Sequence, residues 1–174
     1  MASFKEIVTK TVIGKAKKNS KNEIIINPEQ NPNTILGCWV INHAYSGAND
    51  KGLVNISGSY DINVWYSYDS DHKTAVTTKT YTYNDSINVP IKSNGEFNQN
   101  SEIIIRSLKQ PTVSNAVIDS NNVKLTIEKE LGVEIVGEGK IKVSIEDDED
   151  DYEEVFDDNK LDEVIDEIDT EYLK

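Results

Sequence analysis

Two histidines are the first candidates for acid–base or metal chemistry in this chain. His43 follows a strand-like apolar run, and His72 lies beside Asp69 and Asp71 in a polar segment. Neither belongs to an HExxH motif or to a Cys/His cluster with the spacing that holds zinc. We therefore expect no metal site. His72 is interpreted as part of a polar turn, and His43 as a hydrogen-bonded structural histidine.

The motifs of phosphate loops and of serine hydrolases are absent from the sequence. GxSxG, GxxxxGK[ST] and GxGxxG do not occur, and GEGK at 137–140 lacks the phosphate-loop spacing. Hydrolysis by acid–base catalysis also needs a positioned acid and base. Asp61, expected on the polar face of a strand, is the one candidate that we would test. We expect no catalytic residue, no cofactor and a protein that is not an enzyme.

Aromatic side chains are dense on what read as two neighbouring strands. They are Trp65, Tyr66, Tyr68, Tyr81 and Tyr83. In a β-sandwich, such residues either pack in the core or form a platform on which a sugar ring can stack. Core packing explains most of them, whereas Trp65 falls on the polar face of its strand. A carbohydrate-binding module that uses Trp65 and nearby tyrosines is therefore the alternative function.

Residues 53–68 carry the clearest secondary-structure signal. Every second residue from Val54 to Tyr68 is apolar or glycine, and the residues between them are polar except for Trp65. A period of two over this length predicts a strand with one buried face, bent near Gly58. A polar turn at 69–72 and a segment rich in Thr and Tyr at 74–83 complete a predicted hairpin.

The rest of the first 146 residues reads as further short strands separated by polar turns. Segments 133–136 and 141–145 are predicted to be two strands joined by a turn at 137–139, and segment 102–108 is ambiguous between strand and short helix. About nine strands without a long helix are typical of an all-β fold. We expect an antiparallel β-sandwich or barrel-like domain over residues 1–146.

Residues 147–174 differ sharply in composition and are predicted to form an acidic interaction tail. From residue 146 onward there are 16 acidic and two basic residues, although the whole chain carries a net charge of only −13. Such a tail disfavours nucleic acid and anionic membranes as partners and often marks an interaction segment. The residues expected to bind partners are the acidic Asp147, Asp148, Glu149, Asp150 and Asp151 and the helically spaced Leu161, Val164, Ile165, Ile168 and Tyr172. The latter set predicts a short amphipathic helix that another protein would stabilise.

The opposite end of the chain is basic. Its predicted first strand carries Lys10, Lys15, Lys17 and Lys18. These lysines could protect a sheet edge from uncontrolled pairing, attract the acidic end of a neighbouring molecule, or simply be solvated. The start of the chain lacks the pattern of a secretory signal, and no apolar run is long enough for membrane insertion, so we expect action in the cytoplasm. The single cysteine, Cys38, is either a small buried residue or a link to another chain.

Two segments resemble a known family. TILGCWVINHAY at 34–45 and YDINVWYSY at 60–68 are similar to the signature segments of the CotE family of outer spore-coat morphogenetic proteins. The similarity extends over nearly the whole chain, and departs around 93–100 and in the tail. The signature residues, with possible roles in self-assembly, are Cys38, Trp39, His43, Asp61, Trp65, Tyr66 and Tyr68.

The resemblance implies a scaffold rather than a catalyst. Proteins of this family are made in the mother-cell cytoplasm and self-associate around the forespore as a homo-oligomer or lattice. They anchor to the basement-layer protein SpoIVA and recruit outer-coat client proteins, a role associated with the acidic carboxy-terminal region. The chain is therefore expected to be assembled into the outer layer of the spore coat.

Overall fold

The computed structural model describes residues 3–145 of the chain. Backbone packing groups Glu6–Val143 as one unit, and the strands pack around their core within it. Seven strands make up the described chain: β1 (Ser3–Ile26), β2 (Thr34–Asp50), β3 (Leu53–Tyr68), β4 (Lys73–Asn88), β5 (Gly95–Glu96), β6 (Glu102–Asp119) and β7 (Asn122–Ile145). No helix capable of crossing a membrane occurs in this part of the chain.

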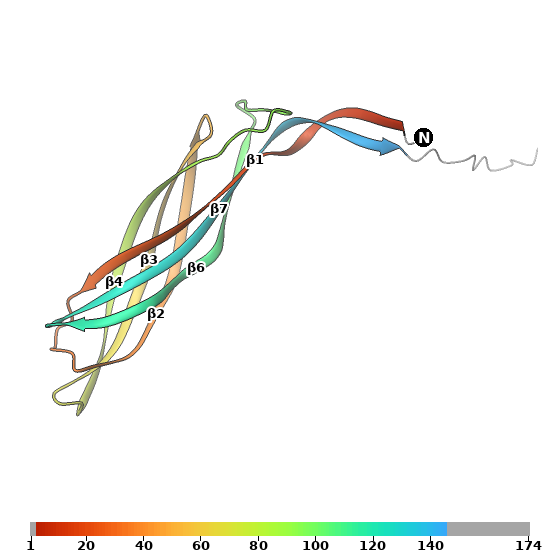
Figure 1. Cartoon of the computed structure of the whole chain (residues 1–174). Helices are drawn as coiled ribbons and strands as arrows, with labels where there is room; N and C mark the ends of the chain where they lie inside the picture. Colours follow the sequence, from red (N-terminus) through yellow and green to blue (C-terminus); the bar gives the residue numbers. More distant parts are fainter. Residues whose placement is uncertain (1–2, 146–174) are drawn as a thin grey trace, which may run out of the picture. The chain divides into compact units, whose positions relative to one another are not determined.

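The strands form two sheets that face each other (Figure 1). In the three-stranded sheet, β3 lies between β2 and β4 and pairs antiparallel with both. In the four-stranded sheet, β7 pairs with β1 on one side and, at successive positions along its length, with β6 and β5 on the other. The predicted all-β, antiparallel fold class is confirmed.

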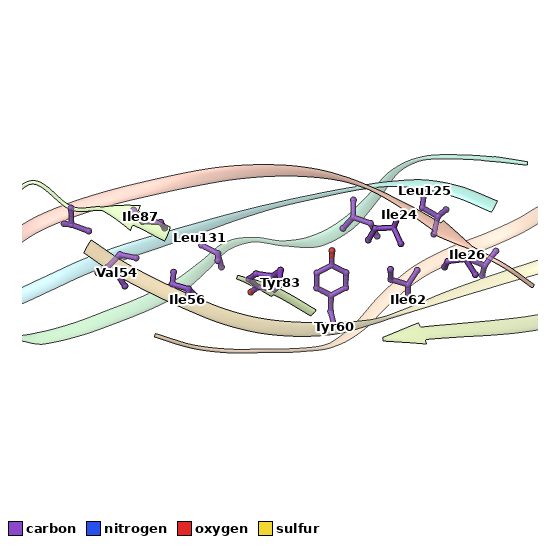
Figure 2. Close-up of a cluster of buried hydrophobic side chains, with 14 of the residues drawn as sticks. Ile24, Ile26, Val54, Ile56, Tyr60, Ile62, Tyr83, Ile87, Leu125 and Leu131 are labelled. Atoms are coloured by element: carbon purple, nitrogen blue, oxygen red, sulfur yellow. The ribbon is translucent and has the colours of Figure 1, made fainter. Parts of the chain in front are cut away.

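The hydrophobic core lies between the two sheets (Figure 2). From β3 it takes Val54, Ile56, Tyr60, Ile62, Val64 and Tyr66, the parity that the sequence predicts to be buried. From β7 it takes Val123, Leu125, Ile127, Leu131, Val133 and Ile135. Alternate residues of a strand point to opposite faces, so one apolar parity on each central strand is enough to fill the space between the sheets.

The turn predicted at 137–139 is wrong, because β7 runs through these residues without interruption. Gly137 and Gly139 instead make room for the side chains of β1. A Cβ at Gly137 would lie 2.7 Å from Cδ1 of Ile13, and one at Gly139 would lie 2.6 Å from Cγ2 of Thr11. Real Cβ atoms do not approach so closely, so the glycines here serve interstrand packing rather than chain reversal.

Two other predicted segments also belong to longer strands. Segments 6–18 and 22–27 each have the composition of a separate short strand, but β1 runs through both without interruption to Ile26. Segment 102–108 is strand rather than helix, as the start of β6. Strand β6 continues through Pro111 with register shifts between Ser107 and Asn115. Proline is tolerated there because β6 is paired only with β7 in its sheet and the pairing is irregular at this point.

Candidate functional site

The outer face of the β2–β3–β4 sheet is the strongest candidate for a functional surface in the described chain. Trp65 of β3 lies opposite Gly37 of β2 and Val76 of β4. Two residues further along β2 on the same face, Trp39 lies opposite Asn63 of β3. Both indoles are 42% exposed, and Val76 is 54% exposed. Large apolar side chains grouped in this way on a sheet surface are typical of a binding site rather than of scattered surface residues.

Gly37 lies next to both indoles. A Cβ placed on it would have one ring atom of Trp39 and one of Trp65 as its nearest neighbours, each at 3.8 Å. The two tryptophans therefore flank a single position that carries no side chain. We define the tryptophan face as Gly37, Trp39, Asn63, Trp65 and Val76.

Asn63 is the polar member of the tryptophan face. It is only 7% exposed although it lies on the outward parity of β3. Its carbonyl oxygen accepts a hydrogen bond of 2.6 Å from the hydroxyl of Thr78. Its amide nitrogen is buried and has no hydrogen-bond partner among residues 3–145. A buried donor without an acceptor is costly, so Asn63 is a polar group that destabilises the sheet at this position.

A row of hydrogen-bonded polar side chains continues from the tryptophan face along β3. Asp61 accepts a bond of 2.9 Å from the amide of Asn42 and one of 2.6 Å from the hydroxyl of Thr80. These two bonds, from Asn42 first, hold the pKa of Asp61 below its usual range. Asp61 is therefore a carboxylate that accepts hydrogen bonds at neutral pH rather than a proton donor of the hydrolytic type.

Beyond Asp61 the outer face becomes a shallow depression. It is lined by small polar side chains, among them Ser46, Ser57, Ser59, Thr82 and Asn84. The hydroxyl of Ser57 donates a hydrogen bond of 2.7 Å to the side chain of Asn84. The outer face thus changes along β3 from apolar and aromatic at one end to hydroxyl- and amide-rich at the other.

His43 has the structural role that its sequence context predicts. It lies at a register shift of β2, between Ile41 and Ala44, and its ring contacts the sandwich interior. Nε2 is 2.7 Å from the hydroxyl of Tyr83, and Nδ1 is 3.1 Å from the side-chain oxygen of Gln110. Burial lowers the pKa of His43, the hydrogen bond with Gln110 opposes this shift, and the charge of Lys129 adds to it.

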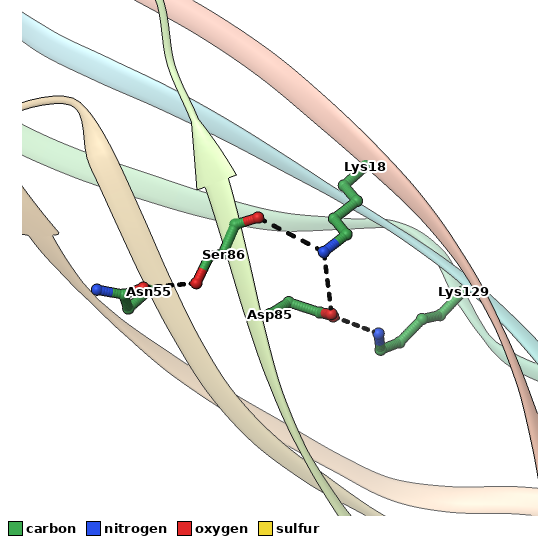
Figure 3. Close-up of polar contacts among 5 residues, drawn as sticks. All are labelled: Lys18, Asn55, Asp85, Ser86 and Lys129. Carbon is green, nitrogen blue, oxygen red and sulfur yellow. Dashed lines mark hydrogen bonds and ion pairs between the residues drawn. The ribbon is translucent and has the colours of Figure 1, made fainter.

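A charge pair that the sequence analysis missed lies beside His43. Lys129 of β7 is 1% exposed, and its ammonium group contacts the carboxylate of Asp85 from β4. Lys18 of β1 reaches the other oxygen of the same carboxylate at 3.4 Å (Figure 3). The ammonium of Lys129 also lies 4.0 Å from the ring centre of Tyr83, within the range of a cation–π contact. Burial first, and then the charge of Asp85, raise the pKa of Tyr83 to about 12.

The lysines of β1 do not form an uncompensated basic patch. Lys10 pairs with Glu102 at 3.0 Å and Lys15 with Glu134 at 3.2 Å. Lys17 pairs with Glu130 at 3.4 Å. The acids come from the adjacent strand β7 and from β6, so much of the local positive charge is balanced within the same sheet.

The remaining signature residues lie in the core between the sheets or are partly buried against it. Tyr66 is buried, Tyr68 is half-buried, and their rings are 6.3 Å apart. Cys38 is a half-buried free thiol whose pKa is raised by burial. Tyr81 and Tyr83 also point inward. The platform predicted from Trp65 and nearby tyrosines is therefore corrected: Trp39, rather than a tyrosine, is the exposed partner of Trp65.

Two sets of predictions are not tested by this geometry. The tail residues, Asp147–Asp151 and the stripe from Leu161 to Tyr172, lie outside the described residues, as does the predicted helix. The expectation of no metal site at the His72 turn is the second set; there, His72 Nδ1 lies 2.9 Å from the backbone oxygen of Asp69. Within residues 3–145, no group of three or more His, Cys, Asp or Glu side chains is placed to hold a metal ion.

Comparison with known proteins supplies a family for this fold. Comparisons with curated proteins and with solved structures give no match. The profile of the family described as outer spore coat protein E (CotE), in contrast, matches residues 3–174. That match includes β1 to β7, the tryptophan face and the acidic carboxy-terminal segment. The chain belongs to the outer spore coat protein E (CotE) family.

Proposed function

We propose that this chain is a morphogenetic scaffold that self-associates through its β domain and recruits other outer-coat proteins through its acidic carboxy-terminal segment. Its role as an outer spore coat protein follows from family membership. Assembly, recruitment, anchoring on SpoIVA and synthesis in the mother cell are the proposed parts. A structural rather than enzymatic role agrees with the family.

The separation of charge along the chain is the observation that carries the proposal. The lysines of β1 are paired with Glu130, Glu134 and other acids of the same domain. Residues 146–174 instead hold 16 acidic residues against two basic ones. A body with balanced charge can approach its own copies without strong repulsion, whereas a strongly anionic segment favours partners with basic surfaces.

The three-stranded sheet supplies a route for self-association. β2 and β4 each pair with β3 alone in that sheet, so each is an edge strand. Edge strands offer backbone groups for pairing with another chain unless they are protected. A layer of such subunits displays many acidic segments, and weak individual contacts to clients then add up through avidity.

The test compares the full chain with a variant that lacks residues 147–174. Light scattering of the purified proteins should find both oligomeric and folded. In sporulating cells, the truncated protein should still surround the forespore but should fail to retain the outer-coat layer. Raising salt should weaken client binding more than self-association, because only the former depends on long-range charge. A full-length protein that stays monomeric at high concentration would contradict the proposal.

A further inference from the structure

We propose that a groove on the outer face of the sheet formed by β1, β7 and β6 binds the acidic segment 161–172 of a second copy of the chain. This contact is additional to the pairing of sheet edges. Its test on the purified protein depends neither on that pairing nor on client proteins.

The groove lies where β1, β7 and β6 run side by side (Figure 1). Its volume is about 210 Å³. Gly132 of β7 leaves the floor without a side chain, and Ala16 of β1 adds a small apolar group. Leu108 of β6 forms one wall, close enough that a Cβ on Gly132 would lie 2.8 Å from its Cδ1 atom. The floor and this wall are therefore apolar.

Leu108 is an apolar side chain that the sheet itself does not cover. It has no partner residue on β7, because the register of β6 shifts between Ser107 and Lys109. Irregular pairing of this kind re-aims a side chain relative to the regular ladder. Leu108 is 54% exposed. Covering it with an apolar group of a partner is favourable in proportion to the area that is buried.

The size of the groove favours the side chains of a docked peptide over a small molecule. Sites that bury a drug-sized ligand usually have a volume of about 300–1,000 Å³. The groove is smaller than that range. Shallow apolar grooves instead accept single anchor side chains from an amphipathic segment that lies across them.

Two lysines at the rim of the groove are available to an acidic partner. Lys15 pairs with Glu134 at 3.2 Å, and Lys17 pairs with Glu130 at 3.4 Å. The side chains of these lysines are 70% and 73% exposed. Ion pairs at such exposed positions contribute little stability, so each lysine can also contact a carboxylate of a partner at small cost.

Arg106 is the strongest cation of the rim. It lies opposite Gly132, lines the groove and is the only arginine of the chain. Among residues 3–145 it has no ion-pair partner. A guanidinium group binds a carboxylate through two parallel hydrogen bonds, which an ammonium group cannot do. With Lys15, Lys17 and Glu134, it gives the lining of the groove a net charge that favours an anionic occupant.

The chain itself carries a segment with the matching chemistry. Residues 161–172 hold six acidic residues and no basic one. Their apolar residues recur at helical spacing and are Leu161, Val164, Ile165, Ile168 and Tyr172. An apolar stripe matches the floor and the Leu108 wall, and the flanking carboxylates match the cationic rim. Each copy of the chain brings one such segment for each groove.

The direction of β7 favours the segment of a second copy over that of the same chain. Glu134 and Val143 are separated by about 30 Å along this strand at the usual rise per residue. The segment begins beyond the strand, so it would have to double back over that length to reach its own groove. The intervening run of acidic residues is expected to oppose such a reversal, because like charges extend a linker.

Binding of a labelled peptide to the full chain tests the groove. A fluorescein-labelled peptide of residues 157–174 should bind, as measured by fluorescence anisotropy. Arg106→Glu should weaken its affinity by about tenfold or more, because a carboxylate of the peptide then faces a like charge. Lys124→Glu is the matched control, with the same change of charge on β7 but about 26 Å along the strand from Gly132. It should leave the affinity unchanged.

A second peptide separates docking in the groove from general attraction between charges. It carries Ile165→Asp and Ile168→Asp, so it is more acidic but has lost part of the apolar stripe. It should bind more weakly than the unmodified peptide. Circular dichroism and the thermal midpoint confirm that each protein variant is folded.

Cross-linking of the unmodified chain then identifies the source of the segment. A carbodiimide joins carboxylates to lysines that they contact, and an equal mixture of nitrogen-15-labelled and unlabelled chains distinguishes the copies by mass. Acidic residues of 161–172 should become linked to Lys15 or Lys17 in pairs of mixed label. The link between Lys15 and Glu134, within one chain, should carry a single label and serves as the internal control.

Four outcomes would overturn the assignment. They are the absence of peptide binding, equal losses for Arg106→Glu and Lys124→Glu, equal affinity of the two peptides, and cross-links that carry only a single label. The last would mean that the segment occupies the groove of its own chain. If the peptide does not bind but the full chain is still oligomeric, this inference fails while the proposed function stands.

Discussion

The ammonium group of Lys129 and the carboxylate of Asp85, 2.5 Å apart, join the two sheets through their common interior. Lys129 lies on β7, the central strand of one sheet, and Asp85 lies on β4 of the other. The Lys129 side chain is 2% exposed and that of Asp85 15% exposed. Breaking a buried pair is costly because it leaves one charge without compensation, even where the intact pair contributes little net stability.

Removal of the acidic partner should therefore destabilise the domain strongly. Asp85→Asn is expected to lower the free energy of unfolding by about 3–5 kcal/mol, since the Lys129 ammonium stays buried. The double variant Asp85→Asn/Lys129→Met should recover most of this loss because it removes both charges. Urea unfolding measures both values. A loss under about 1 kcal/mol for Asp85→Asn, as for a surface pair, would show that the Lys129 charge reaches water in solution.

His43 predicts a dependence of stability on pH near neutrality. Its pKa is lowered in the folded protein, by burial and by the charge of Lys129, so the unfolded chain takes up the proton first as the pH falls. The free energy of unfolding should therefore be highest above about pH 6.5, the unfolded value, and should decrease as the pH falls below it. Tyr83 and Gln110, which share hydrogen bonds with the ring, do not titrate in this range.

The His43 contribution is measured as a difference between variants. Urea unfolding at about pH 7.5 and about pH 5.5 should show a smaller loss of stability for His43→Gln than for the unmodified chain. His72→Gln, in an exposed turn, serves as the control and should keep the full loss. An equal pH dependence in the unmodified chain and in His43→Gln would rule out this role.

Two glycines of the three-stranded sheet should differ in their tolerance of a side chain. A Cβ at Gly58 would lie 2.4 Å from the Cζ and hydroxyl oxygen of Tyr83, which is buried and fixed by His43. Gly58→Ala is expected to lower the free energy of unfolding by about 1–3 kcal/mol through overpacking. Gly37→Ala meets its nearest atoms at 3.8 Å and should be tolerated. Thermal unfolding compares the two, and similar midpoints would contradict the packing at Tyr83.

Cys38 should be a slow nucleophile in the folded protein. Burial raises the pKa of its thiol, so less of the reactive thiolate is present at a given pH. Alkylation by iodoacetamide, followed by mass spectrometry, should be slower for native Cys38 than for the same chain in urea. The control is Val76→Cys in a Cys38→Ser background, which places a thiol at an exposed position. This thiol should react fast without urea. Equal rates for Cys38 with and without urea would mean that this thiol is freely accessible.

The sequence predicts the fold best where periodicity and burial coincide. The alternation in 53–68 places β3 correctly, together with its buried parity and the outward position of Trp65. The following turn and Thr-rich segment correspond to the β3–β4 hairpin. In a strand with one buried and one exposed face, apolar and polar residues alternate, so the sequence alone predicts which face is buried.

Glycine is the residue type at which a prediction from neighbouring residues alone goes wrong in this chain. Gly137 and Gly139 have the local appearance of a turn, yet they lie within β7 because Ile13 and Thr11 of β1 occupy the space above them. A glycine that permits chain reversal and one that admits a neighbouring side chain look alike in sequence. Only the identity of the neighbouring strand separates the two cases.

Long-range pairs account for the rest of what the sequence did not reveal. Lys129 shares the buried parity of β7 with Ile127 and Leu131, which is a signal for a buried lysine. Its partner Asp85 is 44 positions away and cannot be identified from that pattern. The same holds for Trp39 and Trp65, since their joint exposure around Gly37 depends on the β2–β3 register.

The pairing of β7 on both of its edges has a mechanical consequence. This strand, which leads directly into the acidic segment, is hydrogen-bonded to β1 on one side and to β6 and β5 on the other. Tension on that segment, such as a swelling or drying shell would exert, loads β7 along its own axis. Its hydrogen bonds then resist as a group in shear instead of unzipping one after another. Residues 122–145 are thus arranged to transmit a pull on the carboxy-terminal segment into the two sheets through two rows of hydrogen bonds.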